Sequence, residues 1–399
     1  MSITIDHRIR VSVQLVNVAD SSHLWSETYD RTLDDIFAVH DDIAQSVVKE
    51  LRATLLGEAA DSDASGEAKA DVAQAAKGRG TDTEAHRLYL LARHLIDRVT
   101  REDTARGIEY LKQALARDPA FALAWAELGS AYTREVDRGW ASAVEGYGRA
   151  REAVERSLTL EPELPEGHSA MGWIRMTHDW DSRGAEGSFV RALELTPGNA
   201  AALRRTGVLA YNLGRLEEAI GFYRRAAEQD PLNTATYTNL GVALHAADRL
   251  TEAEGAYRKA LELAPQRVNT SAFLSLTLLA QGRVDEALVE AMREPNEQIR
   301  LWALAIVHHA LGHGAESEAA LRELIEVSDV WAFQVAQVHG ARGEADAAFE
   351  WLERAYEQRD PGLPGLRSDS QLRSLHGDAR WGALLEKNGE ICRRRGAQG

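Results

Sequence analysis

Three histidines in the C-terminal half have the residue type and spacing best suited to chemistry. His309 and His313 lie four residues apart and would share one face of a helix, as a pair of metal ligands does. Gly312, however, is expected to end that helix, and no carboxylate lies at a supporting spacing. The sequence around His308 aligns with an earlier stretch of the chain that has Tyr132 at the equivalent position. Packing therefore accounts for His308. The sequence therefore predicts no metal site and no cofactor.

Two other patterns also stop short of a reactive site. Residues 61–66 mimic the start of a calcium-binding EF-hand loop, but its twelfth position is Val72, where a glutamate is required. The single cysteine, Cys392, precedes three arginines that would lower its pKa, yet it has no second cysteine to pair with. Nucleophile-elbow, P-loop and zincin motifs are missing from the sequence. These observations indicate that the chain is not an enzyme.

Composition limits the class of partner. The 399 residues include 46 basic and 62 acidic side chains, a formal net charge of -16, which repels the phosphates of nucleic acids. The longest apolar runs are far shorter than a membrane span, and the first residues do not resemble a signal peptide. We therefore expect no nucleic-acid partner, no direct membrane insertion and a cytoplasmic location. A periplasmic location is the alternative if an upstream membrane segment is missing from this chain.

The elements that would position any site fall into four segments. Residues 57–80 are mostly small, polar or charged, so they cannot bury enough apolar surface to offset the entropy of ordering. This predicts a flexible acidic linker between a partial α+β module over 1–56 and a helical array over 81–360 of about eight units. A C-terminal capping helix and tail are expected over 361–399.

A strict 34-residue period runs through the centre of the helical part. Pro197, Pro231 and Pro265 mark the period, and four further columns share its register: Gly207 with Gly241, Ala219 with Ala253, Tyr223 with Tyr257, and Ala226 with Ala260. The string from Trp125 to Tyr132 also fits the pattern W-x2-L-G-x2-Y. The chain thus resembles the tetratricopeptide repeat family. The resemblance implies a mainly α fold, a right-handed solenoid of helix pairs.

The residue types that recur from unit to unit have physical roles in such a pair. Small residues such as Gly207 on the first helix and Ala226 on the second let two helix backbones approach closely. Proline at the end of a unit stops the second helix, since it lacks an amide donor. The turn inside a pair carries Gly214, Gly282, Gly312 or Gly343, which suits a left-handed helix end.

The N-terminal segment predicts a hairpin followed by a helix. Residues 3–18 alternate in polarity, a second short run covers 23–29, and Thr32 can cap an amphipathic helix. The strings from Arg10 to Val16 and from His23 to Phe37 resemble the C-terminal half of the TolB amino-terminal-like domain. That domain precedes tetratricopeptide arrays in bacterial signalling proteins, often downstream of a nucleotide cyclase, a protein kinase or a winged-helix regulator. Because the chain starts in mid-domain, we expect translation from further upstream or strands from a separate chain.

The resemblance also implies where a partner would bind. In the family the first helices line a concave groove, and inward positions are the second, fifth, ninth and twelfth of each unit. Aromatic, methionine and arginine side chains there are typical interface anchors, although each aromatic could instead pack against the neighbouring unit. Mapped onto this sequence, the candidate groove residues are Glu166, Trp173, Met176, Arg204, Tyr211, Asn212, Thr238, His245, Trp302, His309, Phe333 and Gln337.

The sequence therefore predicts a non-enzymatic scaffold that binds a partner protein or peptide in this groove, in bacterial signalling. The alternative is a regulatory or sensory arm of a nucleotide cyclase, a protein kinase or a transcription regulator. A repeat-based transferase is a weaker alternative, because no second globular domain is evident. Self-association through the N-terminal strands is a further expectation, since a two-stranded hairpin leaves open edges.

Overall fold

The computed structural model describes residues 8–16, 23–32, 43–44, 46–47, 78–98, 100–327 and 331–394. The chain divides into two compact units, each described here by itself. Unit 1 holds Met1–Glu135 with Glu152–Leu164, and unit 2 holds Val136–Arg151 with Pro165–Gly399. The helix expected after Thr32 and the linker expected over 57–80 lie almost entirely outside the described residues. None of the helices in the described ranges is both long and apolar enough to cross a membrane.

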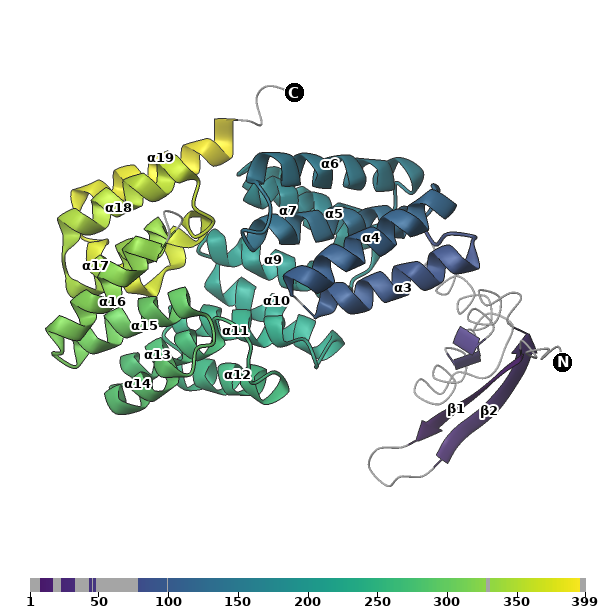
Figure 1. Cartoon of the computed structure of the whole chain (residues 1–399), viewed down its shortest axis with the longest axis horizontal. Coiled ribbons are helices and arrows are strands. Elements are labelled where there is room, and N and C mark those ends of the chain that lie inside the picture. The colour runs from purple at the N-terminus through teal and green to yellow at the C-terminus, as the bar shows by residue number, and fades with distance from the viewer. Residues whose placement is uncertain are drawn as a thin grey trace. The chain divides into compact units, whose positions relative to one another are not determined.

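Unit 1 begins with the expected β-hairpin. Strands β1 (Arg8–Val16) and β2 (His23–Thr32) pair antiparallel, with an irregularity in register between Leu15 and Val16. The Ser12 and Thr28 hydroxyls face each other across the ladder and are joined by a hydrogen bond of 2.9 Å. The prediction of a hairpin at this end of a mainly helical chain is confirmed (Figure 1).

Helix pairs start immediately after the predicted linker. Helices α3 (Thr83–Asp97) and α4 (Arg101–Arg117) pack against each other, and each begins at a side-chain cap. The Asp82 carboxylate accepts from the amide of the third residue beyond it at 2.7 Å, and the Thr100 hydroxyl does the same at 3.1 Å. Helices α5 (Ala122–Asp137) and α6 (Ala143–Leu160) follow, and the chain passes from one unit to the other within both.

Unit 2 continues with six further helix pairs across the described residues 165–327 and 331–358. Their bounds are α7 (Pro165–Thr177), α8 (Ser182–Leu195), α9 (Ala200–Asn212), α10 (Leu216–Gln229), α11 (Thr234–Ala246), α12 (Leu250–Leu263), α13 (Thr270–Ala280), α14 (Val284–Met292), α15 (Glu297–Ala310), α16 (Gly314–Val327), α17 (Ala332–Arg342) and α18 (Ala345–Gln358). The central pairs have the expected 34-residue spacing, so repetition in the sequence corresponds to repetition in the structure.

Close approach within a pair depends on glycine. A Cβ atom at Gly207 would lie 2.6 Å from Cε1 of Tyr223, and one at Gly241 would lie 2.5 Å from Cε1 of Tyr257. No real side chain fits at those distances, so the tyrosine of the second helix packs directly on the backbone of the first. The expectation that these glycine columns allow close helix packing is confirmed.

From the third pair onward, the turn inside each pair contains a left-handed residue. Gly214, Gly282, Gly312 and Gly343 have φ values of 78°, 77°, 75° and 75°, as their position suggested. The equivalent residue is Asp248 in the fifth pair, with φ of 64°, and Trp180 in the third pair, with φ of 55°. A bulky side chain at this position is unusual.

The first helices of successive pairs form one continuous layer in unit 2. Helix α7 contacts α9, and the series continues through α11, α13, α15 and α17. Each second helix packs against its own first helix and the first helix of the next pair. We call the layer of first helices the inner surface, because the stack curves toward the side where consecutive helices touch directly.

The chain does not end after the eighth pair. Two 3-10 helices, η2 (Leu363–Ser368) and η3 (Ser370–Leu375), turn back, and η2 contacts α9 while η3 contacts α17. We call residues 363–375 the inner segment. Helix α19 (Ala379–Arg394) then packs on η2 and reaches α8. Figure 1 shows this yellow C-terminal part beside α17 and α18.

Candidate functional site

The twelve predicted groove residues differ widely in exposure. Glu166 and His309 are exposed, and four others are partly exposed: Trp173, Arg204, Tyr211 and Asn212. The remaining six are buried: Met176, Thr238, His245, Trp302, Phe333 and Gln337. Only the first six present surface that a partner could reach in this conformation.

The buried aromatic residues of this set belong to the cores between pairs. The Trp302 ring packs edge-on against Phe273, with ring centres 5.8 Å apart. Phe333 lies against Gly362, where an added Cβ would come within 2.4 Å of its ring. Met176 packs in a cluster with Phe189 from α8. Packing against the neighbouring helix pair, the alternative raised for the aromatic positions, describes Trp302, whereas Phe333 packs on the chain that follows α18.

Two predicted groove residues contact the inner segment. The Tyr211 hydroxyl donates to the backbone oxygen of Ser368 at 3.4 Å, and the Ser368 hydroxyl donates to the backbone oxygen of Tyr211. The Gln337 amide donates to the Asp369 carboxylate at 2.6 Å. Part of the predicted groove is thus occupied by the chain itself. Sequence reasoning missed this occupant, although leucines three residues apart, at 363 and 366 and again at 372 and 375, were a signal of a short buried helix.

His245 is held inside α11 rather than offered to a ligand. Its Nδ1 lies 2.7 Å from the Thr277 hydroxyl. Burial lowers the pKa of His245 to about 4, and the nearby charge of Arg373 in the inner segment acts in the same direction. The imidazole is therefore neutral at physiological pH.

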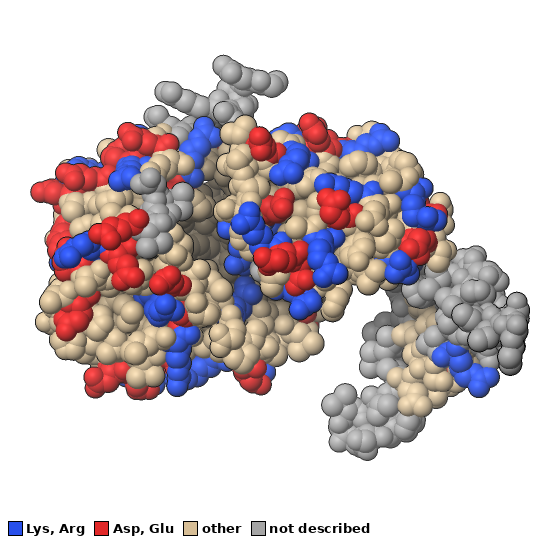
Figure 2. Space-filling view, viewed as in Figure 1, with Lys and Arg blue, Asp and Glu red and all other residues tan. Residues whose placement is uncertain are grey.

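Four arginines gather on the inner surface, and we call Arg138, Arg204, Arg205 and Arg267 the arginine cluster. The Arg267 Nε donates to the Thr238 hydroxyl at 3.3 Å. Burial, together with the charges of Arg138 and Arg204, lowers the pKa of Arg267 to about 10. Like charges are therefore held close together in a partly desolvated place, an arrangement that favours an anionic ligand. Figure 2 shows blue Lys and Arg atoms inside the hollow beside α9 and α10.

An aromatic anchor stands next to the arginine cluster. Both oxygens of the Asp137 carboxylate are engaged, because the Tyr147 hydroxyl donates at 2.7 Å and the Trp173 indole donates at 2.9 Å. The Arg205 guanidinium lies 5.7 Å from the centre of the Trp173 ring and donates to the Ser169 hydroxyl at 3.0 Å. Asp137 thus fixes the orientation of Trp173, and Trp173 in turn supports Arg205.

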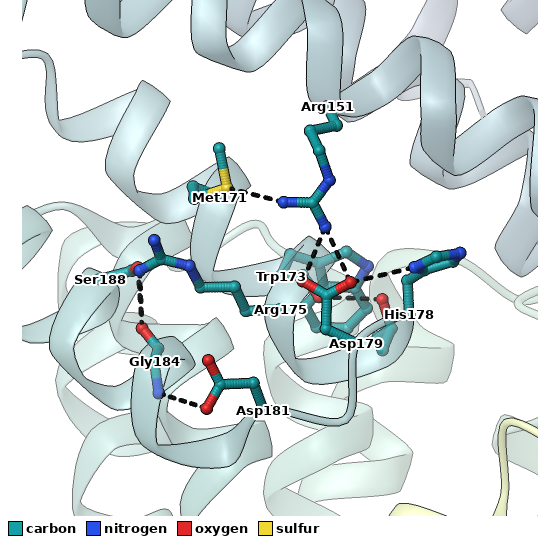
Figure 3. Close-up of polar contacts among 10 residues, drawn as sticks. Arg151, Met171, Trp173, Arg175, His178, Asp179, Asp181, Gly184 and Ser188 are labelled. Carbon is teal, nitrogen blue, oxygen red and sulfur yellow. Dashed lines mark hydrogen bonds and ion pairs between the residues drawn. The ribbon is translucent and has the colours of Figure 1, made fainter. Parts of the chain in front are cut away.

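An ion pair holds this part of unit 2 together (Figure 3). Nη2 of Arg151 donates to both carboxylate oxygens of Asp179, at 2.8 and 2.6 Å. Nδ1 of His178 lies 3.1 Å from the same carboxylate, and the His178 ring packs on Tyr147 with centres 4.8 Å apart. The pair joins residues 136–151 to the turn after α7, so it keeps Asp137 and Trp173 in register.

The cluster of histidines differs from the expected pairing. His308, rather than His309, lies next to His313, with their Nδ1 atoms 3.4 Å apart. Burial lowers the pKa of His308, and the neighbouring His313 lowers it further. Within the described ranges, no group of three His, Cys, Asp or Glu side chains could hold a metal ion.

The sequence identified only part of the arginine cluster. Arg204 and Trp173 were expected on the inner face, but Arg138 and Arg267 lie in connections between helices. Their approach to α9 depends on how successive pairs curve, and a repeat pattern does not report that curvature. Two arginines in sequence at 204 and 205 were the available signal.

Comparison with known proteins finds a family model that matches parts of the chain and a relative that matches the chain in part. Residues 89–137, 181–234 and 223–268 match the model of the tetratricopeptide repeat. A protein named putative adenylate cyclase 3, from Rhizobium meliloti, is 31% identical over an aligned length of 178, and the match covers 42% of this chain and 28% of that protein. The chain therefore spans little more than a quarter of the length of that relative.

Solved structures are similar to parts of the chain. A tetratricopeptide repeat protein from Parabacteroides merdae has a TM-score of 0.44 at 17% identity, over 66% of this chain and 98% of that one. YrrB, a TPR protein with an unusual peptide-binding site, has a TM-score of 0.35 at 17% identity, over 48% of this chain and 96% of that one.

Proposed function

Because this chain carries tetratricopeptide repeats, a fold typical of protein–protein interaction scaffolds, we propose that it is a non-enzymatic module that binds an acidic segment of a partner protein. The binding place is the inner surface around the arginine cluster. Trp173 and Arg204 are its anchors, as aromatic and arginine side chains commonly are in interfaces.

The observation that carries the proposal is that the arginine cluster is positively charged although the chain as a whole is negatively charged. The chain has a formal net charge of -16, yet four arginines share the inner surface near α9. Burial lowers the pKa of Arg267 and repulsion from Arg138 and Arg204 adds to that effect; a bound carboxylate would relieve the repulsion. Electrostatic complementarity of this kind selects acidic partners and speeds their association.

A short polyglutamate peptide tests the proposal by isothermal titration. We expect the chain to bind it, and we expect the double variant Arg138→Glu with Arg204→Glu to bind about tenfold more weakly or worse. Affinity should fall as salt rises, because partly exposed charges are screened. Circular dichroism should show that the variant keeps its helices.

A matched double variant controls for net charge. Arg224→Glu with Arg258→Glu changes the charge equally but lies on the exposed faces of the second helices α10 and α12. We expect it to bind the peptide nearly as the unchanged chain does. Equal weakening by both doubles would refute a localised site. Tighter binding of an oligonucleotide than of polyglutamate would refute a protein partner.

A second candidate function is a regulatory arm of a nucleotide cyclase. The 31% identity over 178 residues to the putative adenylate cyclase 3 favours it. Reading the DNA upstream of Met1 tests this candidate, since an in-frame cyclase domain would make the array part of a larger enzyme. If no cyclase gene lies upstream or adjacent, and the chain does not alter the activity of a purified cyclase domain of that relative, the candidate fails.

A further inference from the structure

The two ends of the array in unit 2 meet along a seam. On one side lie α8, α9 and α11; on the other lie the inner segment, α18 and α19. Helix α19 contacts α8, and η2 contacts α9. The inner surface is thereby closed on one edge by elements far apart in the sequence.

Most of the contacts across the α9 and α11 side of the seam are polar. Besides the reciprocal bonds of Tyr211 and Ser368, Arg373 donates to the Ala246 oxygen at 2.7 Å and pairs with Asp248 at 3.3 Å. Side chains of Arg367 and Arg373 are exposed, and together with Leu213 and Gly214 of the turn after α9 they line a pocket of about 340 Å³. Water therefore reaches this side of the seam.

The opposite side of the inner segment is apolar. Leu363, Leu366 and Leu372 are fully buried in a cluster with residues of α17, α18 and α19. The inner segment is consequently bound more firmly to the C-terminal helices than to α9 and α11. If the seam opens, it opens between the inner segment and α9, and the C-terminal helices move as one body.

One tryptophan crosses the seam. Trp180 sits in the turn before α8, and only 5% of its surface is exposed. Its ring meets Tyr356 of α18 edge-on at 6.2 Å, and the Arg359 guanidinium lies 6.0 Å from its centre. Trp180 belongs to the same cluster as the buried leucines, so it is the apolar link between the two sides.

Trp180 also occupies a strained position. It stands where Gly214, Gly282, Gly312 and Gly343 stand in other pairs, and it adopts φ of 55°. A bulky residue at positive φ is disfavoured, and such outliers persist where they serve a function. This turn packs against α18, through the contact of Trp180 with Tyr356.

The seam lies close to the proposed partner site. Arg204 and Tyr211 are seven residues apart on α9, and Thr238 and His245 have the same spacing on α11. Seven helical residues span about 10 Å, so the inner segment begins roughly two turns from the arginine cluster. A partner segment that extended along α9 from the arginines would meet it.

From these observations we propose that Trp180 and the inner segment form a latch that closes the inner surface and limits how much of a partner can bind. This inference rests on the proposed function, because the partner it gates is the acidic segment assigned to the arginine cluster. Opening the latch exposes Tyr211 and Asn212 and extends the binding surface.

Two variants of the full chain open the latch from opposite ends. Trp180→Gly removes the indole but leaves the residue best suited to that turn, so the turn itself is retained. Arg373→Ala removes the contacts to Ala246 and Asp248. Arg367→Ala is the matched control, since Arg367 is an exposed arginine of the same segment that meets the turn at Gly214 only through its aliphatic part, and no hydrogen bond or ion pair of its side chain is found within the described residues.

Hydrogen exchange and peptide titration read out the result. We expect both latch variants to speed amide exchange in 363–375 by about tenfold, without change in α13 to α16, and to bind polyglutamate several-fold more tightly. Arg367→Ala should match the unchanged chain. Exchange that stays slow, or rises uniformly over unit 2, would show a fixed cap and overturn the latch. Faster amide exchange in the latch variants with unchanged affinity for polyglutamate would refute the claim that the latch limits partner binding. The proposed function would still be supported if the arginine-cluster double variant alone lost peptide binding.

Discussion

Asp369 offers a direct test of the energetics of the inner segment. Its carboxylate accepts from the Gln337 side chain at 2.6 Å and from the Gln371 amide at 2.9 Å. Desolvation outweighs these bonds and raises the pKa of Asp369 from 3.8 to about 6. We predict that Asp369→Asn stabilises the protein at neutral pH.

The sign follows from proton binding. Between about pH 4 and pH 6 the folded chain holds the Asp369 proton more tightly than the unfolded chain, so the free energy of unfolding falls as pH rises through this window. Above about pH 6 the free energy of unfolding no longer changes through this group. A shift of about two pKa units corresponds to about 3 kcal/mol, taken as an upper bound because the residue keeps some contact with water.

Asparagine keeps the shape and removes the charge. Its Oδ1 can still accept from the Gln371 amide, while its Nδ2 faces Gln337. A flip of the Gln337 amide would turn its Oε1 toward that donor, and this buried Oε1 has no hydrogen-bond partner within the described residues. We therefore expect Asp369→Asn to raise the free energy of unfolding by roughly 1–3 kcal/mol above pH 6. This figure allows for a weaker hydrogen bond where the charged carboxylate has been replaced.

Urea unfolding of both proteins, followed by circular dichroism from about pH 4 to pH 8, measures the difference. Burial also raises the pKa of Asp360 and Glu294, but both groups are present in both proteins, so their effects cancel. The advantage of the variant should shrink toward zero below about pH 4. An advantage that does not change with pH, or a variant less stable at every pH, would refute the assigned titration.

Two further predictions concern packing and the ion pair of unit 2. Gly241→Ala should lower the free energy of unfolding by about 1–3 kcal/mol, because its Cβ would overlap Tyr257; Gly255→Ala, on the open face of α12, should raise it by up to about 1 kcal/mol. Thermal melting of the two variants decides, and equal effects would contradict the packing argument. Asp179→Asn should cost about 1.5–3 kcal/mol through Arg151, and a double variant with Arg151→Ala should cost little more if the two act as a pair.

The helix pairs were predictable because their signals are local. Gly207, Tyr223 and Pro231 each act within one pair, so their spacing in sequence is also their spacing in the fold. The same holds for Gly214, whose left-handed conformation is required by one turn. Signals of this kind are repeated every 34 residues and reinforce each other.

The site was less predictable because it depends on curvature. Arg267 approaches Arg204 only when two connections and a helix come together, and Tyr211 meets Ser368 across 157 positions of sequence. Small angles between successive helix pairs add up over that distance, and the total curvature cannot be inferred from the residue type at any one position. Trp302 is buried because the neighbouring pair covers its inward position, and Phe333 because the chain after α18 folds back over it.

The closure at Trp180 has a consequence for how this array can evolve. An open repeat array can gain or lose a unit with little cost, since each unit touches only its neighbours. Here the turn before α8 must meet Tyr356, so inserting or deleting one unit between them would shift one partner away from the other. Duplication of a helix pair between α8 and α18 would break the contacts of Trp180 and those of the inner segment together. The number of helix pairs between α8 and α18 is therefore constrained by this contact, as the number of blades is in a closed propeller. Helix pairs before α7 are not subject to this constraint.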